Sequence, residues 1–401
     1  MRCSAPLLAP LLCLAFNAAP VAAETISAEI NRAGLAATEL RLAALPAATD
    51  EEKFALGGVR FLGALESAMQ KRWESGMTDT TGVLPFLRTP IPENPNPGPP
   101  DPALITAVFT DAALAMNAAR ASLSTIPDTS DFGMELSLAD VWFDVNANTV
   151  RDAGEGLVEL LGPMLIGWQW ESRDPATPAP VIRFDVADAA WLSAYTHMLG
   201  GFSEIVLAYD PTAALTQTMA ATEALQALDP THKDADEYNI NAAINVIATL
   251  DLALSQTPDA DRMASAKAHF LAMVADNRRF WALVETEADN AKEWLPNDRQ
   301  KSAMGVDLPK GAGIAWLAIL TDVEGLLNGT KLLPYWAVGS AAGVNVERMF
   351  SDPRAVDLIG WIQGWAALPY LEQGDVVGSA SWTAFEGMIS GDAMLFALYL
   401  N

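Results

Sequence analysis

Long segments with apolar residues at helical spacing constrain the fold more than any other feature of this sequence. Residues 50–75 and 186–209 each have one apolar face, and the second face is rich in aromatic side chains. Alanine is abundant and strand-forming residues are sparse, which also favours helices. The pattern therefore predicts an all-α protein. The further helices we expect cover 102–124, 211–228, 234–256, 259–291, 311–328 and 353–367.

Asp-Pro dipeptides mark the starts of several of these expected helices. They occur at Asp101-Pro102, Asp210-Pro211, Asp229-Pro230 and Asp352-Pro353. An aspartate accepts hydrogen bonds from the free N–H groups of the first turn, and a proline at the first helical position has no N–H group to satisfy. Each dipeptide therefore predicts a helix that starts at it or a few residues after it.

Two short segments have a strand-like pattern, at 134–138 and 181–185, and we expect them to pair as a small ribbon. Residues 89–101 are rich in proline, which excludes both a helix and a central strand and predicts an extended loop. We therefore expect an N-terminal helical segment at 24–88, this loop at 89–101, and a main helical domain at 102–401.

The N-terminus has the features of a cleaved signal peptide. Arg2 supplies a positive charge, residues 7–16 are apolar but too short to span a membrane, and Val21-Ala22-Ala23 has small residues where a signal peptidase cleaves. The sequence predicts a signal peptide at 1–23 and a mature chain that starts at Glu24. Because both cysteines lie before residue 24, the mature chain would have no thiol.

The net charge of −26 narrows the range of partners and compartments. Nucleic acids and anionic membrane surfaces have the same sign of charge, so neither is expected to bind. After the signal peptide no apolar run is long enough for a membrane-spanning helix. We expect a soluble protein in the periplasm, or a secreted one, whose partner is a small molecule, a glycan or another protein.

The segment 144–155 is the one stretch in which the residue types and their spacing indicate a particular chemistry. Oxygen-bearing side chains occur at its first, third, fifth, ninth and twelfth positions, and its seventh position would offer a main-chain carbonyl. Ca²⁺ prefers six to eight oxygen ligands, and this spacing lets them converge on a curled loop. The segment resembles an EF-hand calcium loop. The predicted ligands are Asp144, Asn146, Asn148, Val150, Asp152 and Glu155.

Two residues of this loop depart from the EF-hand pattern. Its sixth position is usually glycine because the backbone needs a positive φ there, but here it is Thr149. Its eighth position is usually apolar, where paired EF-hands contact each other, but here it is Arg151. No second loop of this kind occurs in the sequence, so a bound ion would be solitary and structural. The alternative is a turn in which Asn and Asp side chains bond their own backbone.

A second group of polar and aromatic residues lies near the C-terminus. Trp361 and Trp365 are one helical turn apart in the expected helix 353–367, with polar side chains nearby in the sequence. Aromatic surfaces beside carboxylates suit sugars and amphipathic ligands, but a packed core with a buried Arg–Asp network is the interpretation we favour. The residues of this ligand cleft, if it is one, are Arg354, Asp357, Trp361, Trp365 and Glu372.

The sequence also resembles a family of uncharacterised exported bacterial helical proteins. The segments that carry this resemblance are 195–199, 293–300 and 332–374. It implies a helical fold and no particular chemistry.

The sequence has no zincin motif, no nucleophile-elbow motif and no phosphate-loop motif. We therefore expect an exported calcium-binding protein with a binding or structural role. The alternative is a periplasmic hydrolase that cuts a glycan or cell-wall fragment with two carboxylates in an aromatic cleft.

Overall fold

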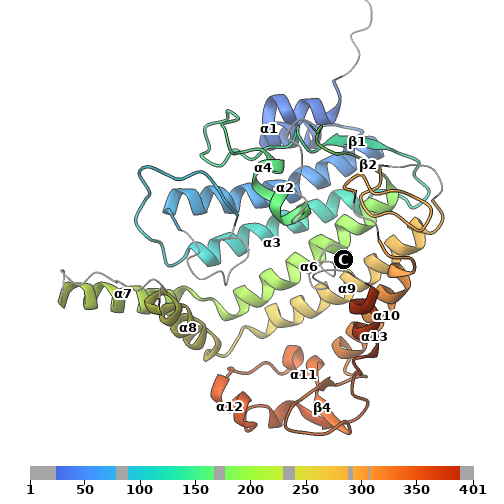
Figure 1. The fold of residues 1–401 in the computed structure, drawn as a ribbon. Coiled ribbons are helices and arrows are strands. Elements are labelled where there is room, and N and C mark those ends of the chain that lie inside the picture. Colours follow the sequence, from blue (N-terminus) through green and yellow to red (C-terminus); the bar gives the residue numbers. More distant parts are fainter. Residues whose placement is uncertain are drawn as a thin grey trace, which may run out of the picture.

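A computed structural model describes residues 24–77, 89–166, 177–228, 240–287, 292–305 and 308–388 of the chain. The protein is all-α, with packed helices and two small antiparallel sheets (Figure 1). The predicted signal peptide at 1–23 lies outside the described residues. Among the helices described, none has both the length and the apolar run that a membrane crossing needs.

Three helices form the N-terminal part of the fold. Helix α1 (Ile26–Ala43) packs on α2 (Asp50–Ser75), and α2 packs on α3 (Leu104–Leu123) (Figure 1). The sequence predicted a helical segment at 24–88 and placed α2 in it with its observed bounds, but it did not place α1 as a separate helix. Helix α2 starts at a capping box in which the Thr49 hydroxyl accepts from the Glu52 N–H and the Glu52 side chain accepts from the Thr49 N–H.

The two central helices are α6 (Val186–Tyr209) and α9 (Ala260–Val284), which have the most extensive helix–helix packing among the described elements. Helix α3 packs against α6 on the other side. Trp191 in α6 and Phe280 and Trp281 in α9 are buried in the main core. The aromatic face predicted for α6 is therefore mostly a core face, although Phe202 is 49 % exposed.

Two other groups of helices complete the body. Helices α7 (Thr212–Leu228) and α8 (Ile240–Leu254) pack on each other and extend away from it, while α10 (Ala312–Leu327) and α13 (Ala380–Met388) pair beside α9 (Figure 1). Helix α4 (Leu157–Ile166) follows the candidate calcium loop. The Asp210 carboxylate accepts from the Thr212 N–H at the start of α7. Asp101 likewise accepts from Ala103, but α3 begins at Leu104.

The predicted ribbon is confirmed. Strand β1 (Met134–Ser137) pairs antiparallel with β2 (Val181–Phe184), with Met134 opposite Phe184 and Ser137 opposite Val181. The sequence did not predict the second sheet, in which β4 (Ala342–Val344) lies between β3 (Leu333–Pro334) and β5 (Leu371–Gln373). Its strands have two or three residues each, too few to show an alternating pattern.

The single helix predicted at 353–367 is wrong. That region has helix α11 (Val346–Ser351) before it, helix α12 (Leu358–Gln363) within it, and a 3₁₀ turn at Leu368–Tyr370 after it. Asp352 is paired with Arg354 instead of starting a helix, and Asp357 caps α12 by accepting from the Gly360 N–H. Gly364 ends α12 with a φ of 123°, a conformation that favours glycine.

Candidate metal centre

The candidate calcium loop is closed by a short antiparallel contact between its two ends. Trp142 and Gly156 form a bridge, and the Phe143 N–H donates to the Glu155 carbonyl at 2.9 Å. Helix α4 begins directly after this bridge, at Leu157. The residues on both sides of the loop are thus tied together, which brings its first and twelfth positions close in space.

The backbone of the loop curls around the side chain of Asp144. One carboxylate oxygen of Asp144 accepts from the Asn148 N–H at 2.9 Å, and the other accepts from the Thr149 N–H at 2.8 Å. Ala147 and Thr149 have positive φ values of 56° and 64°. The sixth position therefore adopts the left-handed backbone that an EF-hand loop needs, although its residue is β-branched and poorly suited to it.

The predicted ligand side chains converge on Asp152. The side-chain nitrogens of Asn146 and Asn148 donate to the same Asp152 oxygen, Oδ2, at 2.8 and 2.7 Å. The amide oxygens of Asn146 and Asn148 accept from the Asn148 and Val150 N–H groups at 3.1 and 2.7 Å, so these side chains also bond the backbone of their own loop.

Glu155 closes the loop from inside the protein. Its side chain is 0 % exposed. One oxygen accepts from the Val145 N–H at 3.0 Å and the other from the Asp152 N–H at 2.7 Å. Burial raises the pKa of this carboxyl, because a charge is costly to desolvate unless it is paired. A cation beside Glu155 would relieve this cost. Val150 has no side-chain oxygen, so only its main-chain carbonyl could face an ion.

Helix α2 adds a further carboxyl group to this region. Glu66 is 7 % exposed, and its Oε2 accepts from the Asp144 N–H at 2.8 Å. Burial, and to a smaller extent the charges of Asp144 and Glu155, raise the pKa of Glu66 to about 7. The sequence placed Glu66 in a helix but had no signal for this contact, which joins residues 78 positions apart.

Sequence reasoning also missed a buried carboxylate cluster. Asp185, Asp188 and Glu293 are all buried, and one oxygen of each lies within 4.8 Å of the others. Asp185 and Asp188 form the capping box of α6, and Arg183 lies 3.6 Å from the Asp185 carboxylate. Burial and the Asp185 charge raise the pKa of Asp188 well above its ordinary value. Three such groups could hold a metal ion, but Asp185 and Asp188 are already engaged in the capping bonds of α6, and Asp185 also lies beside Arg183.

Two histidines meet between the central helices. Nδ1 of His197 in α6 lies 2.9 Å from Nδ1 of His269 in α9. Burial, the Arg120 guanidinium and His269 lower the pKa of His197 to about 3, and burial also lowers that of His269. This pair is a neutral hydrogen-bonded contact between the two helices. His232 lies outside the described residues.

The C-terminal residues singled out in the sequence are held in local contacts, and Arg348 links Glu372 to Asp352, the partner of Arg354. Asp357 caps α12 and accepts from the Trp365 indole, Arg354 pairs with Asp352, and Glu372 accepts from Asn345. Because α12 ends at Gln363, Trp361 and Trp365 do not share a helix face. The prediction of a packed core with a buried Arg–Asp network is wrong, because Arg354 and Asp357 are exposed and Trp365 is 51 % exposed. The half-buried Trp361 stacks on Tyr370 at a centroid distance of 5.8 Å.

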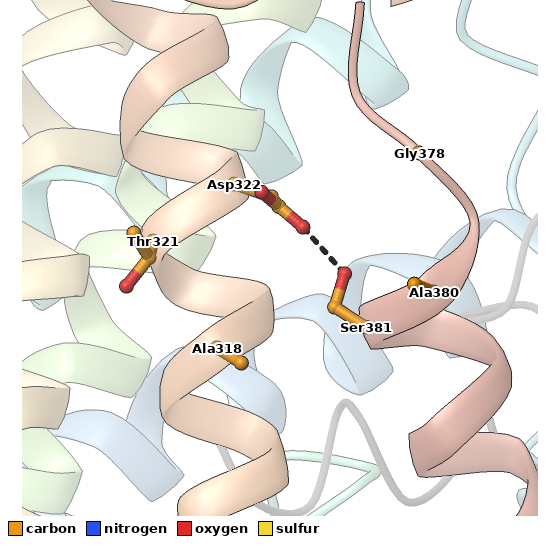
Figure 2. A pocket seen from close by; sticks show the side chains of 6 residues that line it. All are labelled: Ala318, Thr321, Asp322, Gly378, Ala380 and Ser381. Carbon is orange, nitrogen blue, oxygen red and sulfur yellow. Dashed lines mark hydrogen bonds between the residues drawn. The ribbon is translucent and has the colours of Figure 1, made fainter.

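Two hollows of about 460 Å³ each lie elsewhere in the described part of the chain. One lies between α10 and the start of α13, where Ser381 donates to Asp322 (Figure 2). The Asp322 carboxylate also accepts from Lys331 at 2.6 Å. The other hollow lies between α1, α2 and α3 and has Glu39, Glu66 and Asp111 in its wall. Neither is lined by an aromatic side chain.

Comparison with known proteins gives no match to a family model, to a curated protein or to a solved structure. The resemblance carried by 195–199, 293–300 and 332–374 therefore stays a prediction. The function has to be argued from the geometry of the sites.

Proposed function

We propose that this chain is an exported helical protein that binds one Ca²⁺ ion in the loop 144–155, and that the ion stabilises the fold. The observation that carries the proposal is the curled backbone of the loop, which brings the side chains of Asn146 and Asn148 together at Asp152. With Asp144, the Val150 carbonyl and a bidentate Glu155, the loop offers a donor set of oxygen atoms only. Ca²⁺ prefers such a set, whereas zinc and copper prefer nitrogen and sulfur.

The charge of the loop also supports a bound cation. Its three carboxylates are opposed within the loop only by Arg151, whose guanidinium donates to Asn31 and to the Ala139 carbonyl. The protein as a whole has a net charge of −26, so a divalent cation reduces repulsion both locally and overall. The poor fit of Thr149 to its left-handed backbone should weaken the site. A dissociation constant of about 10⁻⁴–10⁻³ M, as in extracellular modules, suits an exported protein.

The glycan hydrolase is not supported by an observation in the described residues. Arg354, Asp357 and Glu372 are engaged in local contacts, and the hollows described have no aromatic wall. A binding or structural role is the function that the geometry supports best.

Thermal unfolding of the mature protein with calcium and with a chelator tests the proposal. At free calcium about 100 times the dissociation constant, the gain in free energy of unfolding should be about 2.7 kcal/mol. Magnesium is the matched ion control, because its shorter bonds and octahedral geometry do not suit a wide loop. An unfolding midpoint that is the same in calcium and in chelator would contradict a stabilising ion.

A further inference from the structure

Helix α1 is interrupted at the point where the calcium loop meets it. Gly34 has a φ of 78° and a ψ of 176°, which breaks the helix inside Ile26–Ala43. The last carbonyl oxygens before such a break lack the N–H donors of the next turn. The indole nitrogen of Trp142 donates to two of them, Ile30 and Asn31, at 2.9 and 3.2 Å. Trp142 is 3 % exposed and lies two residues before the first loop position.

The same ring fits the break sterically. A Cβ atom on Gly34 would lie 3.0 Å from the Trp142 ring, tighter than ordinary contacts. The positive φ and this close approach both favour glycine at position 34. On the far side of the loop, Arg151 donates to the Asn31 side chain at 3.0 Å. Helix α1 thus contacts the loop both before its first position and at its eighth.

Helix α2 holds the first ligand position directly. Glu66 and Gln70 are one helical turn apart. Glu66 accepts from the Asp144 N–H at 2.8 Å, and the Gln70 side-chain nitrogen donates to the Asp144 carbonyl at 2.7 Å. Both main-chain groups of Asp144 are therefore fixed from α2, while its carboxylate faces the loop backbone.

We infer that helices α1 and α2 are the support of the calcium loop, with Gln70 and Trp142 as positioning residues, so that ion binding and the packing of these two helices stabilise each other. In paired EF-hands a neighbouring loop gives such support; here the eighth position, Arg151, contacts α1 instead. Coupling of this kind is reciprocal: helices that favour the binding conformation of the loop are themselves stabilised by the ion. The inference rests on the proposed calcium site.

Two variants test it by isothermal titration with calcium chloride. Gln70→Ala removes the bond to the Asp144 carbonyl from a half-buried position, and Trp142→Phe removes the indole donor but retains a ring. Each variant should raise the calcium dissociation constant about 10-fold, which is the lower end of the effect of losing an outer-shell partner. Gln256→Ala is the matched control, because its amide also donates to a main-chain carbonyl, that of Tyr209, far from the loop. Its dissociation constant should equal that of the wild type.

Hydrogen exchange gives a second readout that a general loss of stability would not reproduce. In the wild type, calcium should slow amide exchange in α1 and α2 and leave α7 unchanged. Wild-type calcium binding with unaltered dissociation constants in both variants would overturn the inference and leave the calcium site standing. Absence of calcium binding in the wild type would overturn the proposed function itself, and the inference with it.

Discussion

Replacement of Glu155 by glutamine separates the role of the carboxylate in the fold from its role toward calcium. The fully buried Glu155 carboxylate accepts hydrogen bonds from two main-chain N–H groups, those of Val145 and Asp152. Glutamine keeps one acceptor oxygen and turns an NH₂ group toward the other N–H. Loss of a hydrogen bond to a charged group costs about 1.5–3 kcal/mol, but the neutral side chain no longer has a buried charge to desolvate. We expect Glu155→Gln to lower the free energy of unfolding by about 1–2 kcal/mol in chelator.

In calcium the same variant should lose more. With the proposed calcium site, the wild type should gain about 2.7 kcal/mol at free calcium 100 times the dissociation constant, and most of this gain should require Glu155 as a bidentate ligand. The total difference between the wild type and the variant should therefore be about 4 kcal/mol in calcium. Urea unfolding of both proteins, with calcium and with chelator, measures all four values.

The control for this experiment is Glu159→Gln, four residues further on. Glu159 Oε2 accepts from the Gly154 N–H at 2.9 Å, but it is not at a ligand position. This variant should lose a little stability and keep the full calcium increment. An equal calcium increment in the wild type and in Glu155→Gln would refute the assignment of Glu155 as a ligand.

Three further predictions follow from single residues. Thr149→Gly should strengthen calcium binding, because glycine adopts the φ of 64° without strain. Calcium titration of both proteins measures this, and an unchanged or weaker affinity in the variant would show that strain at this position is unimportant. The pKa of His197 is about 3 in the folded protein and 6.5 in the unfolded chain. As the pH falls below 6.5, only the unfolded chain binds a proton at His197, so the folded protein loses stability. At pH 5 this loss should be about 1 kcal/mol after allowance for partial exposure, and His197→Gln should remove it in urea unfolding at pH 7 and 5; an identical slope in both proteins would count against it. Trp361→Ala should cost about 2 kcal/mol by the same assay, less than the 3–5 kcal/mol of a fully buried aromatic, because Trp361 is half-buried; a cost in the full range would mean that the stack on Tyr370 is a core contact.

Local patterns predicted the parts of the fold in which one element is long and regular. The bounds of α2 and α6 and the pairing of 134–138 with 181–185 followed from the periodicity of the apolar residues. Helix α1 was not placed as a separate element, and its backbone breaks at Gly34, so its helical spacing is not continuous. The single helix at 353–367 was wrong because Asp352 pairs with Arg354 and Gly364 has a positive φ, so that within this range only Leu358–Gln363 is helical.

The candidate site shows the same limit. The spacing from Asp144 to Glu155 indicated the loop, since its ligands lie within twelve residues. Glu66, Gln70 and the break in α1 come from segments 74 to 112 residues away, and no local pattern connects them to the loop. The cluster of Asp185, Asp188 and Glu293 was missed for the same reason, although Asp185 and Asp188 have the spacing of a capping box.

Equilibrium dialysis of the mature protein against calcium, with the metal content of both compartments measured, tests the central claim most directly. The account predicts one calcium ion per chain with half-saturation at about 10⁻⁴–10⁻³ M, and loss of most of this binding in Glu155→Gln. Equal calcium concentrations on the two sides of the membrane up to 10 mM, at a salt concentration that screens the net charge, would contradict it and leave residues 144–155 as a turn held by its own side chains.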